Sequence, residues 1–303
     1  MQDTRSTTRW GYAALASAIL LFSTIEVASK WIGPSVPPLR LAVLRFLAGG
    51  LALAPFAARE IRSRKWTRQD LLILAGLALT GVTALSGFYH FAITLMPANQ
   101  AAILFSGNPV FVAALAPALL GERIGRRERG AMALGVAGTI AFLWGRGHFS
   151  LQTAAGVMFM LCAMFFFALY TVLTKKCLPR YGAVPLTCLA CIFGSLALVP
   201  VSWLREGSPF RAIPLPALLA VAYLALATTA LAYVLFFHGL KRVPASRGSL
   251  FFFIKPPAAA LLAWLVLHEA FTLPMAAGTA LILAGTALTL RRAAPVREAA
   301  ITD

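Results

Sequence analysis

The chain has 303 residues, of which 60% are hydrophobic and only 12% are charged, and its mean hydropathy is +0.81. Soluble domains are about half apolar and a quarter charged, and disordered chains are much less hydrophobic, so this composition excludes both classes. The net charge of +17 comes from basic residues in short loops beside apolar runs. That distribution is typical of membrane proteins and argues against nucleic acid as a partner.

Long apolar runs follow one another along almost the whole chain. A membrane-spanning helix needs about 20 apolar residues, and turn or charge signals separate the runs. We therefore expect an all-α polytopic membrane protein, with the lipid bilayer as its surroundings. The ten predicted transmembrane helices cover residues 11–32, 39–58, 71–95, 98–120, 128–145, 153–176, 183–203, 215–240, 246–267 and 273–290.

The distribution of Lys and Arg predicts how the chain lies in the membrane. Most of the 27 basic residues fall in loops on the side of the two termini, whereas the opposite loops hold only Arg146, Arg205 and Arg211. Basic residues collect in cytoplasmic loops, so both termini are expected in the cytoplasm. The first run follows Arg5 and Arg9 as a signal peptide would, but Glu26 and Lys30 interrupt it, and we expect a retained helix.

The second half of the sequence repeats the first. At nearly constant offset the matching pairs are Gly11 and Gly156, Phe22 and Phe167, Lys30 and Lys175, Pro97 and Pro244, Pro109 and Pro256, and Glu122 and Glu269. The pattern predicts a cytoplasmic tail (1–10), a first repeat (11–145), an outer loop (146–152), a second repeat (153–290) and a basic cytoplasmic tail (291–303). Five helices per repeat is an odd number, so the second repeat is inverted.

Inverted repeats are a recurring construction of secondary transporters, which open one central site alternately to each side of the membrane. The sequence has no G-x-x-x-x-G-K-[ST] phosphate loop, so we expect a carrier without an ATPase of its own. A small molecule is the expected substrate, and the sequence leaves open whether protons or a counter-substrate drive its movement. No cofactor is expected.

Several motifs carry a resemblance to a known family. Residues 88–98 (FYHFAITLMPA) lead into Asn108-Pro109-Val110-Phe111 and Gly121-Glu122-Arg123, and residues 240–246 (LKRVPAS) begin an echo that ends at Glu269. The chain resembles the EamA-type branch of the drug/metabolite transporter superfamily over essentially its whole length. The resemblance implies a multi-pass exporter of the bacterial inner membrane, often for amino acids or related metabolites. It also implies a cavity lined by the first, third, fourth, sixth, eighth and ninth helices.

Lys255 is the sharpest candidate for substrate binding. It lies about nine residues, or ~14 Å, into the ninth predicted helix, and ionisable groups at such depth are costly and rare. Its repeat partner is Asn108, and each residue precedes a proline: Pro109 on one helix, Pro256 and Pro257 on the other. Proline frees a backbone carbonyl four residues earlier and kinks the helix, which for Pro256 is the carbonyl of Phe252. We expect Lys255 to contact a carboxylate or other anion, with Asn108 as hydrogen-bonding partner; the structural alternative is that Lys255 pairs with Glu26 or caps the carbonyls freed at the kink.

A second group of polar residues is expected near the outer side. Glu26, Lys30 and Arg45 have similar predicted depths to His90, and Glu26 and Lys30 are a favourable i, i+4 pair. The group is interpreted as a gate or as a site for proton coupling, with a purely structural ion-pair network as the alternative.

Aromatic residues of the third and sixth helices are candidates for the cavity lining. Tyr89 and His90 lie on the third helix, and Tyr170 lies on the sixth. Aromatic side chains in such a chain more often serve packing. Glu122 and Glu269 fall at helix ends, where capping of a loop is expected.

Other functions stay open at this point. Within transport, the alternatives are exchange of another organic anion or of a cationic drug or metabolite. A membrane-embedded transferase is a remote alternative, because it needs clustered carboxylates or histidines for metal and phosphate chemistry, and the chain has four histidines and no such cluster. The C-x-x-C pair Cys188 and Cys191 lacks a second pair, so no metal site is expected. The oligomeric state is not indicated.

Overall fold

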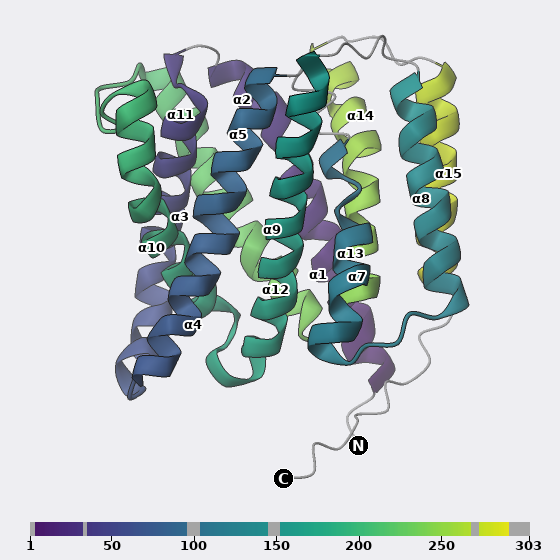
Figure 1. Cartoon of the computed structure of the whole chain (residues 1–303), viewed down its shortest axis with the longest axis horizontal. Coiled ribbons are helices and arrows are strands. Elements are labelled where there is room, and N and C mark those ends of the chain that lie inside the picture. Colours follow the sequence, from purple (N-terminus) through teal and green to yellow (C-terminus); the bar gives the residue numbers. More distant parts are fainter. Residues whose placement is uncertain (1–3, 33–34, 96–103, 145–151, 268–272, 291–303) are drawn as a thin grey trace.

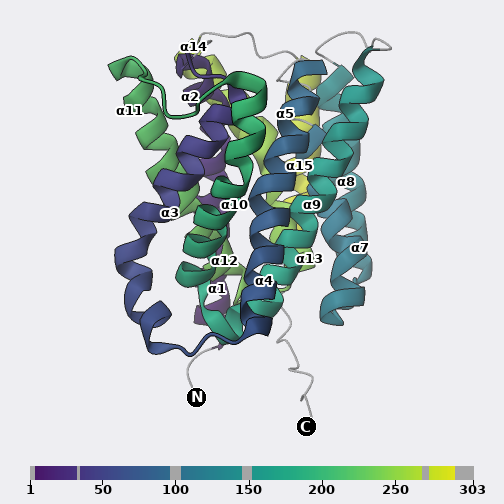
Figure 2. The ribbon, with the colours of Figure 1, turned by 60° about the vertical axis from the view of Figure 1, so that its left-hand side comes forward.

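The computed structural model describes residues 4–32, 35–95, 104–144, 152–267 and 273–290, and every regular element in these ranges is a helix. The helices stand side by side in one bundle and run alternately between its two ends (Figure 1). Helix α1 begins and helix α15 finishes at the same end, which we call the lower end; the other is the upper end. Figure 2 shows the same arrangement after a turn of 60°.

The elements follow the predicted apolar runs, with boundaries shifted by a few residues. In chain order they are α1 (Thr4–Ser23), α2 (Ile25–Ile32), α3 (Pro38–Ser63), α4 (Arg68–Ala78), η2 (Leu79–Ala84), α5 (Leu85–Leu95), α7 (Asn108–Leu120), α8 (Arg126–Trp144), α9 (Gln152–Tyr181), α10 (Ala183–Glu206), α11 (Leu215–Tyr223), η3 (Leu224–Leu231), α12 (Ala232–Leu240), α13 (Ala245–Ser249), η4 (Leu250–Ile254), α14 (Lys255–Leu267) and α15 (Leu273–Leu290).

Five helical segments in the described ranges are long and apolar enough to cross a membrane. They are Pro38–Ser63, Arg68–Ile93, Ala154–Tyr181, Ala183–Glu206 and Leu215–Leu240. Crossing by the other predicted segments stays a prediction, and the start of the predicted segment 98–120 lies outside the described residues.

Two π-helical segments interrupt long helices, and each packs against a glycine of another helix. A Cβ added to Gly194 of α10 would lie 2.6 Å from the carbonyl oxygen of Ala78, where η2 begins. One added to Gly49 of α3 would lie 2.8 Å from the carbonyl oxygen of Ala225 in η3. Side chains larger than hydrogen do not fit at these two crossings, so glycine is what lets the helix backbones touch.

Helices α3 and α10 are antiparallel neighbours with a carboxylate near each end. At the upper end, Glu206 of α10 accepts hydrogen bonds from the backbone N–H groups of Leu39 (3.0 Å) and Arg40 (2.8 Å) in the first turn of α3. At the lower end, Glu60 of α3 lies beside Gly182, the residue before α10, where an added Cβ would be 3.1 Å from Oε2. A negative charge stabilises the start of a helix, so Glu206 caps the upper end of this pair across the two halves of the chain.

The helices change character at the prolines that the sequence singled out. Helix α7 begins at Asn108, directly before Pro109 and after a turn at residues 106–107. The 3₁₀ segment η4 gives way to α14 at Lys255, directly before Pro256 and Pro257. Both irregular stretches lie inside the bundle, next to the predicted site residues.

Candidate functional site

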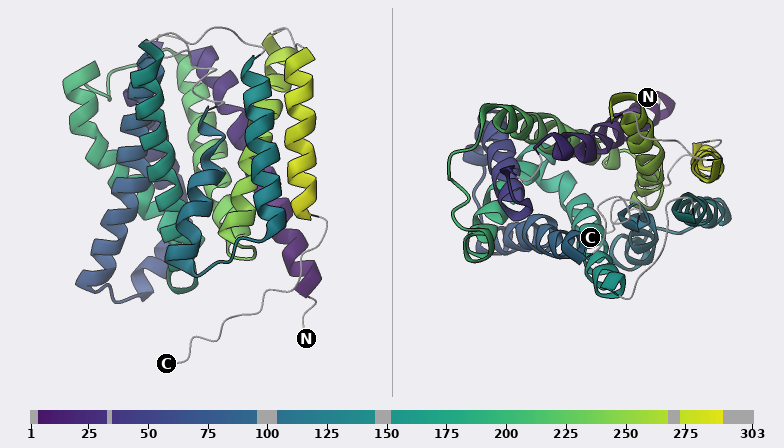
Figure 3. Two further views of the ribbon diagram at one scale, coloured as in Figure 1. Left: turned by 45° about the vertical axis from the view of Figure 1, so that its right-hand side comes forward. Right: turned by 90° about the horizontal axis from the view of Figure 1, so that it is seen from above.

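A cluster of aromatic rings occupies the interior of the bundle. Phe252 of η4 is at its centre and is 2% exposed. Its ring centroid lies 5.3–6.5 Å from those of four other rings, Phe22 of α1, Phe105, Phe167 of α9 and Phe236 of α12. The helices around the middle of the bundle, which Figure 3 shows, therefore contact one another through these aromatic side chains.

Lys255 brings a positive charge to this cluster. Its side chain is 6% exposed, and Nζ lies 5.8 Å from the centroid of the Phe105 ring, within range of a cation–π interaction. Burying an ammonium group is costly and needs compensating contacts, of which the Phe105 ring supplies one. A cation beside the aromatic cluster is suited to bind an anion that enters from water.

Asn108 is fully buried, and only one of its two side-chain polar atoms forms a hydrogen bond with the described residues. Its Nδ2 donates a hydrogen bond to the carbonyl oxygen of Met164 in α9 at 2.8 Å, which fixes the orientation of the amide. Its Oδ1 is buried and accepts no hydrogen bond from the residues that the structure describes. Buried polar atoms are nearly always paired, so an unpaired one needs an explanation. Asn108 and Phe105, whose ring lies under the Lys255 cation, belong to the same short stretch of chain.

Tyr89, His90 and Tyr170 have different surroundings. The Tyr89 ring meets the Phe105 ring edge to face at 5.7 Å, so Tyr89 adjoins the cluster. His90 is next to it, and its Nδ1 is buried without a hydrogen-bond partner. Tyr170 is 1% exposed, and a Cβ added to Gly81 would lie 2.3 Å from its ring. Tyr170 is thus packed on the backbone of η2.

The predicted outer group is described only in part. The Arg45 guanidinium lies 4.5 Å from the centroid of the Phe46 ring and is close enough to His90 to act on it electrostatically. The side chains of Glu26 and Lys30 lie outside the described residues. A gate or proton site built from Glu26, Lys30 and Arg45 therefore stays a prediction.

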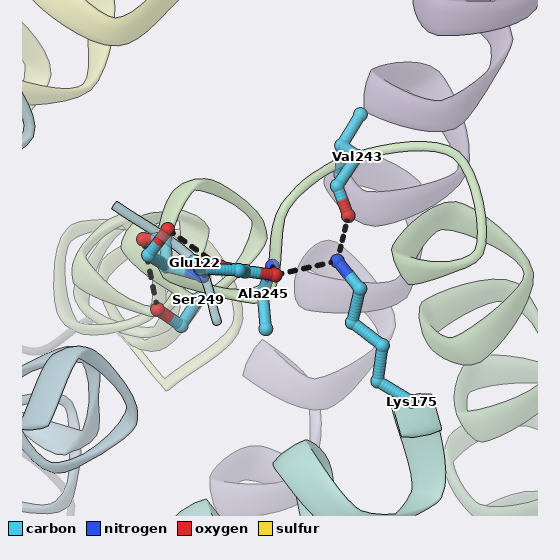
Figure 4. Close-up of polar contacts among 6 residues, drawn as sticks. Glu122, Lys175, Val243, Ala245 and Ser249 are labelled. Atoms are coloured by element: carbon cyan, nitrogen blue, oxygen red, sulfur yellow. Dashed lines mark hydrogen bonds and ion pairs between the residues drawn. The ribbon is translucent and has the colours of Figure 1, made fainter. Parts of the chain in front are cut away.

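Glu122 forms the polar network that the sequence did not reveal. Helix α7 ends at Leu120, and the next residue, Gly121, has a φ of 66°, which favours glycine. Glu122 then turns toward α13. The Glu122 carboxylate binds Lys175 Nζ (2.9 Å), the backbone N–H groups of Ala245 (2.7 Å) and Ser246 (3.0 Å), and the Ser246 hydroxyl (2.8 Å) (Figure 4). Lys175 also donates to the Val243 carbonyl at 2.5 Å.

This carboxylate is strongly stabilised in its charged form. Burial acts to raise the pKa of Glu122, but the Lys175 charge and the backbone donors outweigh it, and the pKa lies below its usual value. The repeat partner in the sequence, Glu269, lies outside the described residues. The signal available beforehand was the Gly-Glu pair after an apolar run, which predicts a cap but not its partners.

The predicted site residues are separate from an apolar hollow on the outside of the bundle. An apolar hollow of about 310 Å³ lies on the outside of the bundle between α3, α10 and η3, and its lining includes Leu53, Phe56 and Leu231 but none of the predicted site residues. Within the described residues, no three His, Cys, Asp or Glu side chains are grouped closely enough to hold a metal ion.

Comparison with known proteins identifies the family. The EamA-like transporter family matches residues 9–144 and again residues 154–291. An "Uncharacterized transporter" of Clostridium kluyveri is 28% identical, over 91% of each chain. A Streptantibioticus cattleyicolor protein named "Probable terminal-alkyne amino-acid exporter" is 28% identical over 93% of this chain and 92% of its own.

A solved crystal structure supports the fold. It covers 94% of this chain and 96% of its own with a TM-score of 0.78, at 24% identity. The two family matches together span most of the sequence, and the apolar composition and the helical bundle agree with them. The chain is thus a multi-pass membrane transporter and not an enzyme, and it belongs to the EamA-like transporter family.

Proposed function

We propose that this protein is a secondary exporter of a small amphipathic metabolite with a carboxylate, most simply an amino acid, in the inner (plasma) membrane of a bacterium. The observations that carry the proposal are a buried cation, Lys255, over the Phe105 ring of an aromatic cluster, and a buried acceptor three residues after Phe105, Asn108 Oδ1, that accepts no hydrogen bond from the described residues. An α-carboxylate matches the cation, an α-ammonium matches the amide oxygen, and an apolar side chain matches the rings.

We further propose that all ten segments cross the membrane as two inverted repeats, residues 11–145 and 153–290, with both termini in the cytoplasm. Two separate matches to one family support this division. The paired contacts support the inversion: Gly49 packs on η3 as Gly194 packs on η2, and Glu60 lies at the start of α10 as Glu206 caps α3. Repeats related in this way allow a central site to open to either side.

Counterflow in proteoliposomes tests the function. Vesicles preloaded with one unlabelled amino acid are diluted into the labelled compound, across a panel of apolar, aromatic, polar and charged amino acids, with and without a pH gradient. Uptake of a defined subset supports an amino-acid carrier, and dependence on the gradient indicates proton coupling. If folded protein exchanges no member of the panel, amino acids are excluded, and organic anions without an amino group and then cationic compounds follow as panels.

A further inference from the structure

The charged contacts between the two halves of the chain gather at one end. Three ion pairs are formed among the described residues: Asp70 with Arg180 (2.7 Å), Glu122 with Lys175 (2.9 Å) and Glu128 with Arg247 (2.6 Å). In each pair the acid belongs to the first half and the base to the second. All three lie at the lower end, where α4, α8 and α13 begin and α9 finishes (Figure 1).

Of the three pairs, the one at Glu122 joins the elements that hold the central site. Its carboxylate follows α7, which begins with Asn108, and its cation lies near the lower end of α9, whose Met164 carbonyl orients Asn108. Its backbone donors, Ala245 and Ser246, open α13, which continues through η4 to Lys255. One side chain thus ties α7, α9 and α13 together beneath the site (Figure 4).

Separation of these three elements at the lower end requires that Glu122 lose its partners. The Glu122 and Lys175 side chains are 13% and 18% exposed, so water screens their attraction only weakly. If Glu122 moves away, Lys175 keeps the Val243 carbonyl as an acceptor but loses its counter-charge, and two backbone N–H groups lose their acceptor. Breaking such a pair is costly, because the partners left behind are still partly buried.

We propose that Glu122 and Lys175 form a latch that closes the central site toward the lower end of the bundle and that must open for the site to face that side. The inference rests on the alternating-access transport proposed above. It assigns to Glu122 a conformational role beyond the capping of α13. The structure described here is then the state in which the lower end is shut.

The test measures access to a position directly behind the latch. Ser249 is fully buried one turn beyond Ser246 along α13, in the direction of η4 and Lys255. In a chain whose four natural cysteines are changed to serine, Ser249→Cys is reacted in detergent with a water-soluble maleimide. We expect slow labelling with Glu122 in place and labelling about tenfold faster or more in Glu122→Gln, which keeps the shape and removes the charge.

Glu206→Gln is the matched control. Glu206 also accepts two backbone N–H groups at a helix start in the other half of the chain, but it lies at the upper end and away from the site helices. Its substitution should leave the labelling rate of Ser249→Cys within about twofold of the parent chain. If Glu122→Gln and Glu206→Gln accelerated labelling equally, the effect would be a general loosening of the bundle, and the latch proposal would be wrong.

A second variant guards against misfolding. If Glu122→Gln does not yield folded protein, Lys175→Met removes the same charge pair from the other side, and it should also accelerate labelling about tenfold. A folded variant of either kind with unchanged labelling refutes the proposal. Because labelling needs no substrate, failure of counterflow with accelerated labelling would count against the proposed transport function and not against the opening of this contact.

Discussion

The interior cluster and the lower-end network use charge in opposite ways. Near Lys255, whose cation lies over the Phe105 ring, the buried amide oxygen of Asn108 accepts no hydrogen bond from the described residues. Around Glu122, four donors surround one carboxylate, and its lysine has a second acceptor as well. The paired Glu122 network stabilises one arrangement of the helices, whereas a buried acceptor such as Asn108 Oδ1 costs stability, which a ligand that supplies a donor can restore. Substitutions in the two regions should therefore separate transport from stability.

Lys255→Met should have the largest effect on transport. The variant keeps the length of the side chain and removes the charge, so we expect substrate-dependent counterflow to fall more than about tenfold while folded protein is still recovered in detergent. Lys241→Met, at an exposed position after α12, is the control and should transport normally. Full transport by Lys255→Met would remove the lysine from the substrate site, and loss of folded protein would make it structural.

Glu122→Ala should have the largest effect on stability. Truncation leaves Lys175 without its counter-charge and two N–H groups without an acceptor, so we expect the free energy of unfolding to drop by about 2 kcal/mol. Thermal unfolding in detergent, measured beside Lys255→Met, gives the comparison directly. If Lys255→Met is the less stable of the two, the contrast between the regions is wrong.

Asn108→Ala should weaken substrate binding by about tenfold, the effect of one hydrogen bond that a buried acceptor makes to a charged donor. The concentration for half-maximal counterflow is the measurement. Ser195→Ala is a suitable control, since this buried hydroxyl bonds to the carbonyl of Ile192 in its own helix. Unchanged affinity in Asn108→Ala would mean that Oδ1 stays unpaired in the complex too.

Glu206→Ala should have the smallest effect. Glu206 caps α3 much as Glu122 caps α13, but it has no lysine partner among the described residues and is half-buried. Loss of a cap of this kind costs about 1 kcal/mol. If the free energy of unfolding fell as much in Glu206→Ala as in Glu122→Ala, the Lys175 charge would add nothing to the stability of the Glu122 network.

The sequence predicted the helices well because apolar runs and prolines act locally. The segments fall where hydropathy places them, and the helices change at Pro109 and Pro256 because proline lacks an N–H group. The partners of Glu122 were not predictable, since Lys175 is 53 residues away and Ala245 is 123. Such contacts depend on how the two halves pack. The π-helical turns have no local signal either; only the recurrence of Gly49 at Gly194 marks them.

The capped pair of α3 and α10 has a practical consequence for spectroscopy. Glu206 fastens its upper end, and within the bundle the Cys188 thiol of α10 donates to the Gly50 carbonyl of α3 (3.3 Å), whereas the latch acts at the lower end. When the site changes the side of the membrane that it faces, α3 and α10 should therefore keep their position relative to each other. Spin labels placed on lipid-facing positions of α3 and α10 should keep one separation throughout the transport cycle, and they would serve as an internal ruler against which movements of α7, α9 and α13 are measured.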